Sequence, residues 1–324
     1  MTRLHDLFPE ADLPHVVLGT GPTPVRRLTS WGPEVWAKDE GAFGDGGWGG
    51  NKVRKLEWIV PEAHRRRRQT LFTVGGIGTH WGLAAALYGA EHGLRTVLGL
   101  VEQPVDDHVL DQLDRIAASG ALVHRFDSVL RLKLAAPGLL WRYRDGPRLP
   151  YYLPAGGSSP VGTLGYVDVA LELAAQVRAG ELPEPAVVVT AVGSAGTAAG
   201  LTLGLRLAGL SSRVVGIVVN DAFRLDASVV ARLATRTVGL LRRRGAAVDL
   251  RFTPDDLETT DRYLGETYGA STRAGLAAVA AARAEGLELE PVYTGKTFAA
   301  VRDLAAAAAG PVVVLQTHGP RDRG

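Results

Sequence analysis

Short apolar runs alternate with helical patterns along this chain, and this alternation constrains the fold more than any other feature. Residues 186–191 are an example of a short apolar run. This run is valine-rich and too short for an ordinary helix, as is typical of a buried strand. Residues 79–93 show the other type, with alanine and leucine at helical spacing. The alternation favours an α/β fold in which helices cover mostly parallel sheets.

Eight segments are predicted as strands, and several long segments between them as helices. The predicted strands are residues 35–38, 70–74, 96–100, 121–126, 151–154, 186–191, 214–219 and 311–316, and the predicted helices include residues 79–93, 161–179 and 272–286. A chain of 324 residues can bury a large core and usually divides into two domains. No internal repeat or low-complexity linker is evident in the sequence.

Composition excludes several classes of function. A formal net charge of +2 gives little attraction for a polyanion, and the arginine run 65–68 lies near the end of a predicted helix, where cations complement the helix dipole. The chain has no cysteine, so disulfides, thiolate catalysis and cysteine-ligated metal sites are excluded. Its histidines, including His64, His92 and His124, lack metal-binding spacing, so no metal site is predicted.

The sequence carries neither a membrane-spanning signal nor a secretory one. No apolar stretch is long enough to span a membrane, and residues 1–10 lack the apolar core of a signal peptide. We therefore expect a cytoplasmic protein with neither membrane nor nucleic acid as a partner.

The chain has only five lysines, and Lys52 follows a glycine turn at the start of a predicted amphipathic helix. The electropositive start of a helix favours the neutral amine, which is the form that attacks an aldehyde. This placement suggests a Schiff-base lysine that holds pyridoxal 5'-phosphate (PLP). The alternative is a solvated lysine at a helix start, which is the commoner fate of this residue type.

A glycine-rich loop, Gly193-Ser194-Ala195-Gly196-Thr197, follows the predicted strand 186–191. A strand–loop–helix junction of this kind presents unpaired backbone N–H groups to an anion, with the Ser194 and Thr197 hydroxyls as further donors. The loop lacks the Gly-Lys-Ser/Thr ending that nucleoside triphosphate sites require. It therefore suits a phosphate group, although an ordinary turn of an α/β protein remains the alternative.

Together these motifs give the chain its resemblance to a known family. The chain resembles the PLP-dependent D-cysteine desulfhydrase and 1-aminocyclopropane-1-carboxylate (ACC) deaminase family, which has the tryptophan synthase β fold type. The resemblance rests on residues 18–25, 49–57, 75–77, 157–158 with 160, 165–166, 193–201, 268–269, 285–286 and 291–296. Several motifs in one order are far more specific than any one of them.

The resemblance implies two domains with the cofactor in the cleft between them. A large domain would comprise residues 1–50 and 166–324, and a small domain residues 51–165. A homodimer is also implied. The residues expected to bind the cofactor are Asn51, Lys52, Lys55, His80, Gly193, Ser194, Ala195, Gly196, Thr197 and Thr294.

The resemblance also implies roles for the residues that act on the substrate. Lys52, once freed, would move protons, Tyr268 and Tyr293 would face the substrate, and Thr79 would contact its carboxylate. Thr294 is placed beside the pyridine nitrogen, where ACC deaminases carry glutamate and desulfhydrases carry threonine. A neutral hydroxyl does not stabilise a charged pyridinium, so Thr294 favours β-elimination from a small amino acid, giving a 2-oxo acid and ammonia.

Two segments depart from the family pattern. Gly78-Thr79-His80-Trp81 replaces Gln-Ser-Asn-His, and Gln316-Thr317-His318-Gly319 replaces His-Thr-Gly-Gly. His80 can still donate one hydrogen bond to the cofactor, whereas Trp81 adds bulk or simply packs.

Because both departures lie at the substrate end, β-replacement, racemisation and ACC deaminase-like activity stay open. A catalytically silent protein that binds PLP or a metabolite is the non-enzyme alternative.

Overall fold

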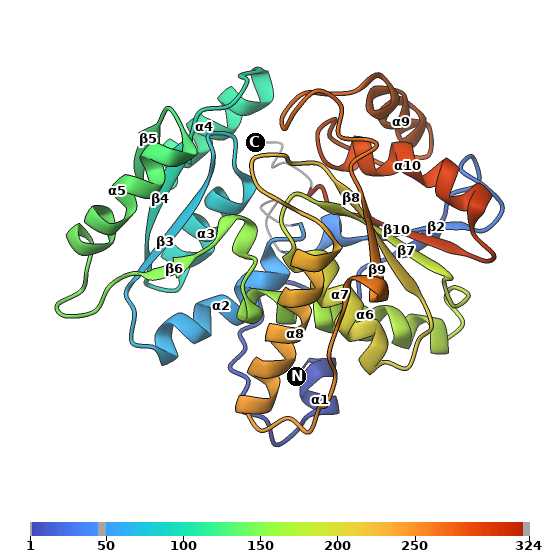
Figure 1. The fold of residues 1–324 in the computed structure, drawn as a ribbon, viewed down its shortest axis with the longest axis horizontal. Helices are drawn as coiled ribbons and strands as arrows, with labels where there is room; N and C mark the ends of the chain where they lie inside the picture. Colours follow the sequence, from blue (N-terminus) through green and yellow to red (C-terminus); the bar gives the residue numbers. More distant parts are fainter. Residues whose placement is uncertain (1, 45–49, 320–324) are drawn as a thin grey trace.

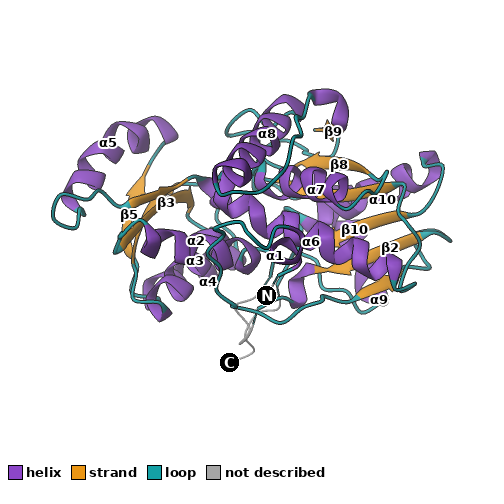
Figure 2. Ribbon diagram, turned by 90° about the horizontal axis from the view of Figure 1, so that it is seen from below, coloured by secondary structure: helices purple, strands orange, loops and turns teal. Residues whose placement is uncertain are grey.

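The computed structural model describes residues 2–44 and 50–319, and two sheets lie at opposite ends of its long axis (Figure 1, Figure 2). Gly49, which begins the glycine–lysine motif, lies outside the described residues. The larger sheet has the order β1 (Val25–Arg27), β2 (Val35–Asp39), β10 (Val312–Gln316), β7 (Val187–Val192), β8 (Arg213–Val218) and β9 (Leu257–Thr260). Of its strand pairs, β1–β2 is antiparallel and the other four are parallel.

The smaller sheet has the order β5 (Leu122–Phe126), β4 (Arg95–Val101), β3 (Thr70–Gly76) and β6 (Tyr151–Leu153), with parallel pairing throughout. All eight predicted strands are therefore confirmed, as is the α/β class with mostly parallel sheets. The short strands β1 and β9 were not predicted, because both are partly exposed and carry little of the continuous apolar signal of a buried strand.

Helices cover both faces of the larger sheet (Figure 1). On one face lie α9 (Arg273–Ala284) and α10 (Thr294–Ala307), and on the other lie α6 (Pro160–Arg178), α7 (Gly196–Leu207) and α8 (Ala227–Arg243). Successive valines of the central strands alternate between these layers: Val188 belongs to the core under α6 and α7, and Val189 to the core under α10. A strand buried on both faces reads as a continuous apolar run, which explains why the sequence signal was strong here.

The smaller sheet is covered in the same way. Leu98 of β4 lies towards α3 (His80–Glu91), and its neighbour Gly99 lies towards Leu132 of α5 (Val129–Arg142). The remaining helices are α1 (Arg3–Leu7), α2 (Val53–Arg65) and α4 (Asp107–Ala118). Among the described residues no helix is both long enough and apolar enough to cross a membrane.

Helix α2 packs directly on α6, between the two sheets (Figure 1, Figure 2). Gly165 makes this possible, because a methyl group at this position would lie 2.1 Å from the Arg54 carbonyl oxygen. We propose the division into a large domain (1–50 and 166–324) and a small domain (51–165) on the basis of the two sheets. The boundary at residue 165 falls inside α6.

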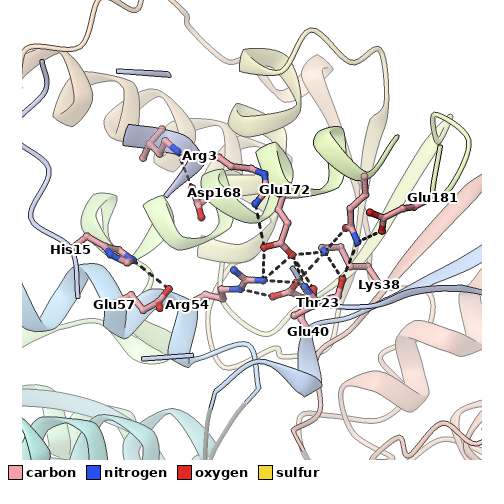
Figure 3. A network of polar contacts seen from close by, with 12 residues as sticks. Arg3, His15, Thr23, Lys38, Glu40, Arg54, Glu57, Asp168, Glu172 and Glu181 are labelled. Atoms are coloured by element: carbon pink, nitrogen blue, oxygen red, sulfur yellow. Dashed lines mark hydrogen bonds and ion pairs between the residues drawn. The ribbon is translucent and has the colours of Figure 1, made fainter. Parts of the chain in front are cut away.

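A buried cluster of charged side chains joins three distant segments (Figure 3). Arg54 of α2 donates to Glu40 at 3.0 Å and to Glu172 of α6 at 3.0 Å, and its guanidinium lies 3.6 Å from the centre of the Phe43 ring. Lys38 of β2 also donates to Glu172, at 2.7 Å. Two cations therefore balance two carboxylates, which is the condition for charges to remain buried.

We expect Arg54→Met to destabilise the protein by about 3–5 kcal/mol, because it leaves two buried carboxylates with Lys38 and the more distant, partly exposed Arg3 to balance them. Urea denaturation followed by circular dichroism measures the change. Arg206→Met is the control, because Arg206 forms an exposed pair with Asp256 and such pairs contribute less than about 1 kcal/mol. Equal losses for the two variants would show that the buried cluster has no special role.

Candidate active site

A cavity of about 500 Å³ lies at the carboxyl ends of strands from both sheets. The smaller sheet contributes Gly75 and Gly76 of β3 and Val101 of β4, and the larger sheet contributes Ala191 of β7 and Asn220 after β8. Parallel α/β sheets bind ligands at this edge, because loops and helix starts gather there. Of the predicted site residues, Asn51, Lys52, Thr79, His80, Gly193, Ser194, Thr197, Tyr268, Tyr293 and Thr294 line the cavity.

Lys52 lies at the N-cap position of α2, and its side chain reaches the cavity. Burial lowers the pKa of its amine to about 8, against the opposing effect of the Glu290 carboxylate. A larger fraction of this amine than of an ordinary lysine is therefore neutral and nucleophilic near neutral pH. The sequence argument attributed this property to the start of the helix, whereas burial is its main cause in the structure.

Lys55 lies one turn further along α2 and is fully buried. Its amine donates to the Gly156 carbonyl at 2.9 Å, and burial, followed by the charge of Lys52, lowers its pKa well below the usual range. No carboxylate is among the described hydrogen-bond partners of Lys55. Two neighbouring amines in this situation are unfavourable when charged, unless an anion binds beside them.

The start of α7 lies beside the Lys55 amine. A methyl group at Gly196 would lie 3.0 Å from Lys55 Nζ, so only glycine leaves this space open. Ala195 caps the helix without a side-chain hydrogen bond, and the Ser158 hydroxyl lies 2.8 Å from that of Ser194 and accepts from the Gly196 N–H at 2.9 Å. A helix start, two hydroxyls and an ammonium group make a suitable cradle for a phosphate.

Two tyrosines meet at the cavity, and the Tyr293 ring lies against Gly193 of the glycine loop. The Tyr268 and Tyr293 hydroxyls are 2.6 Å apart, with their rings nearly perpendicular. Burial raises the pKa of both phenols, and for Tyr293 the neighbouring Tyr268 adds to the effect. Both side chains therefore stay protonated at neutral pH, and each phenol has a proton to offer rather than a phenolate base.

The two segments that depart from the family pattern come together at the cavity. The rings of His80 and His318 are 6.1 Å apart and perpendicular, and both line the cavity. Burial lowers the pKa of His318, opposed by Glu290 and Glu288. Thr79 caps α3 by accepting from the Gly82 N–H at 3.1 Å, so part of its hydrogen-bonding capacity is already used.

Trp81 serves mainly to pack. Its side chain is buried, its ring fills the space beside Gly157, and its indole nitrogen donates to the Thr73 hydroxyl at 2.7 Å. The packing interpretation of this residue therefore accounts for its contacts, although the ring also borders the cavity.

Sequence reasoning missed two polar residues of the site. Ser158 was noticed only as part of a motif, although it links the glycine loop to the Lys55 side of the cavity. Glu290 directly precedes the motif at residues 291–296, and its carboxylate accepts from the Tyr293 N–H at 2.7 Å while lining the cavity. A carboxylate just before a helix start was the available signal, since such residues commonly cap helices.

The other cationic and histidine features agree with a structural role. Arg65 and Arg66 pair with Glu62 at the end of α2, at 2.8 and 2.6 Å. Among the residues described, no group of three or more potential ligands is arranged to hold a metal ion.

Comparison with known proteins agrees with this geometry. The family described as pyridoxal-phosphate dependent enzymes matches residues 16–317. A D-cysteine desulfhydrase of Salmonella schwarzengrund (strain CVM19633) is 32% identical, covering 94% of each chain. A D-cysteine desulfhydrase of Yersinia enterocolitica is 31% identical over 98% of this chain and 97% of that protein.

A solved structure shows the same likeness in three dimensions. The crystal structure of an ACC deaminase homologue superposes with a TM-score of 0.81 at 30% identity, covering 97% of this chain and 94% of the other. Since the match spans nearly the whole chain in sequence and in structure, the protein belongs to the pyridoxal-phosphate dependent enzymes, in the family that includes the D-cysteine desulfhydrases.

Proposed function

We propose that this enzyme catalyses β-elimination from a small amino acid, in the manner of a D-cysteine desulfhydrase, releasing a 2-oxo acid, ammonia and the β-substituent. The observation that carries the proposal is the meeting, in one cavity, of a buried lysine of lowered pKa, a phosphate cradle and a pair of protonated tyrosines. The named relatives support D-cysteine as the first substrate to test.

The described residues fit the cofactor that the family uses. Lys52 provides the neutral amine that bonds to its aldehyde, and Lys55, Ser158, Ser194 and the start of α7 suit its phosphate. Asn51 Oδ1 is buried and has no hydrogen-bond partner among the described residues, so it is available to a bound group. When bound, the cofactor supplies a ring that accepts the electrons released at the substrate's α-carbon.

The chain's own groups then account for the proton transfers. With a substrate bound, the Lys52 amine would act as the base that takes the proton from the α-carbon. The carbon–sulfur bond breaks, and the Tyr268–Tyr293 pair supplies a proton to the departing sulfur. The remaining roles follow the family resemblance. Thr79 would contact the substrate carboxylate, His80 the cofactor oxygen and Thr294 the ring nitrogen.

We also propose that the enzyme is a cytoplasmic homodimer. The homodimeric assembly is supported by the family resemblance, and the cytoplasm is the default location for a chain of this composition. Sedimentation velocity on the purified protein measures the assembly state.

Lys52→Ala should abolish the visible violet absorbance that the wild-type protein develops with PLP, because the proposal assigns the bond with the cofactor's aldehyde to the Lys52 amine. Pyruvate and sulfide formation from D-cysteine should fall by about 10³-fold or more. Absorbance spectroscopy and a pyruvate assay measure the two effects, with L-cysteine, β-chloroalanine and ACC as parallel substrates. A Lys52-dependent band without turnover of any of these substrates would favour the silent cofactor-binding alternative, and no band at all would overturn the proposal.

Lys55→Met should weaken PLP binding by about 10- to 100-fold, since it removes a charge-assisted hydrogen bond to the phosphate. Titration of the apoprotein with PLP measures the affinity. Lys133→Met is the matched control, because Lys133 borders the same cavity but is exposed and distant in sequence from the glycine loop. If both variants bind PLP as tightly as the wild type, the phosphate lies elsewhere.

A further inference from the structure

Glu290 carries a buried carboxylate to which the sequence assigned no role. Its side chain is 9% exposed and borders the cavity at the start of α10. Oε2 accepts from the Val292 N–H at 2.7 Å, and Oε1 accepts from the N–H groups of Tyr293 at 2.7 Å and Thr294 at 2.5 Å. Three backbone donors at a helix start therefore hold this negative charge in place.

The Thr294 hydroxyl is held by the same residue. It accepts from the Glu290 N–H at 2.9 Å, and it lies 3.1 Å from the Glu290 carbonyl oxygen and 3.2 Å from carboxylate Oε1. Both of these acceptors already take shorter bonds, from the Gly295 N–H at 2.8 Å and from the two N–H groups on Oε1. The single hydroxyl proton is directed to these two acceptors of Glu290, and a lone pair of the hydroxyl oxygen is left for a donor in the cavity.

We propose that Glu290 is a positioning residue: it accepts the proton of the Thr294 hydroxyl, so that the hydroxyl oxygen accepts from a protonated ring nitrogen of the cofactor and has a full negative charge behind it. This inference rests on the proposed function, which assigns Thr294 to that nitrogen. The subsite is then a hydroxyl backed by a carboxylate. It stabilises positive charge on the ring more than a lone hydroxyl does, and less than a carboxylate in direct contact.

The charge of Glu290 reaches the other titratable groups of the cavity as well. Its carboxylate opposes the burial that lowers the pKa of Lys52, Lys296 and His318, and it adds to the burial that raises the pKa of Tyr268 and Tyr293. The charge of Lys52 in turn helps to lower the pKa of Lys55, after the larger effect of burial. Removing the carboxylate should therefore lower the pKa of Lys52 and leave its burial unchanged.

Glu290→Gln tests both effects, with Thr294→Val and Glu288→Gln beside it. In the apoproteins, the pH midpoint for formation of the violet band with PLP should lie near 8 in the wild type and about 1 unit lower in Glu290→Gln. Thr294→Val keeps the carboxylate and should keep the midpoint. Glu288→Gln, an exposed change two residues away, should also match the wild type.

The ring nitrogen is examined separately, with PLP enriched in ¹⁵N and bound to each protein. The ¹⁵N resonance should move towards that of an unprotonated ring in both Glu290→Gln and Thr294→Val, and it should not move in Glu288→Gln. If Glu290→Gln lowers the melting temperature but changes neither the midpoint nor the resonance, Glu290 serves only to cap α10 and the inference is wrong. If wild-type protein forms no Lys52-dependent band, the proposed function fails first and the inference fails with it.

Discussion

The position of the reactive lysine depends on a salt bridge that is out of contact with the cavity. Arg54 follows Lys52 by two residues, and Glu40 and Glu172 bind its guanidinium from two different segments of the larger sheet's layer. A buried arginine between two carboxylates has few alternative positions, because any movement would leave charges unpaired. The first turn of α2, and with it Lys52, is therefore fixed by electrostatics rather than by its own capping residues, since its N-cap makes no side-chain hydrogen bond.

The charges at the cavity differ from those around Arg54, because they are incompletely balanced by opposite charges. Lys55 donates only to a carbonyl oxygen, and the start of α7 has no side-chain cap. Each of these arrangements disfavours the empty protein and favours a bound anion. Binding sites commonly retain such unsatisfied groups. In the Arg54 cluster, by contrast, the charges stabilise the fold alone, and cations and carboxylates are paired.

Local sequence signals predicted the parts of the site that are local in the structure. The valine run before Gly193, the loop itself and the start of α7 are contiguous, and Lys52 lies next to its own glycine turn. Ser158 and Glu290 escaped because their roles arise from contacts that sequence spacing does not show: Ser158 meets Ser194 across 36 residues. The lowered pKa of Lys52 was foreseen, but its cause was not, because burial depends on the packing of the whole cavity.

The close contact at Gly165 determines which helices Lys52 and the rest of α2 are packed against. The backbones of α2 and α6 touch there without an intervening side chain. Lys52 and the start of α7 thus belong to one closely packed group of helices, since α6 also packs on α7. The proposed small domain therefore includes Lys52 by sequence only: Thr79 and His80 are carried by the smaller sheet's own elements, whereas the lysine is anchored against helices that cover the larger sheet.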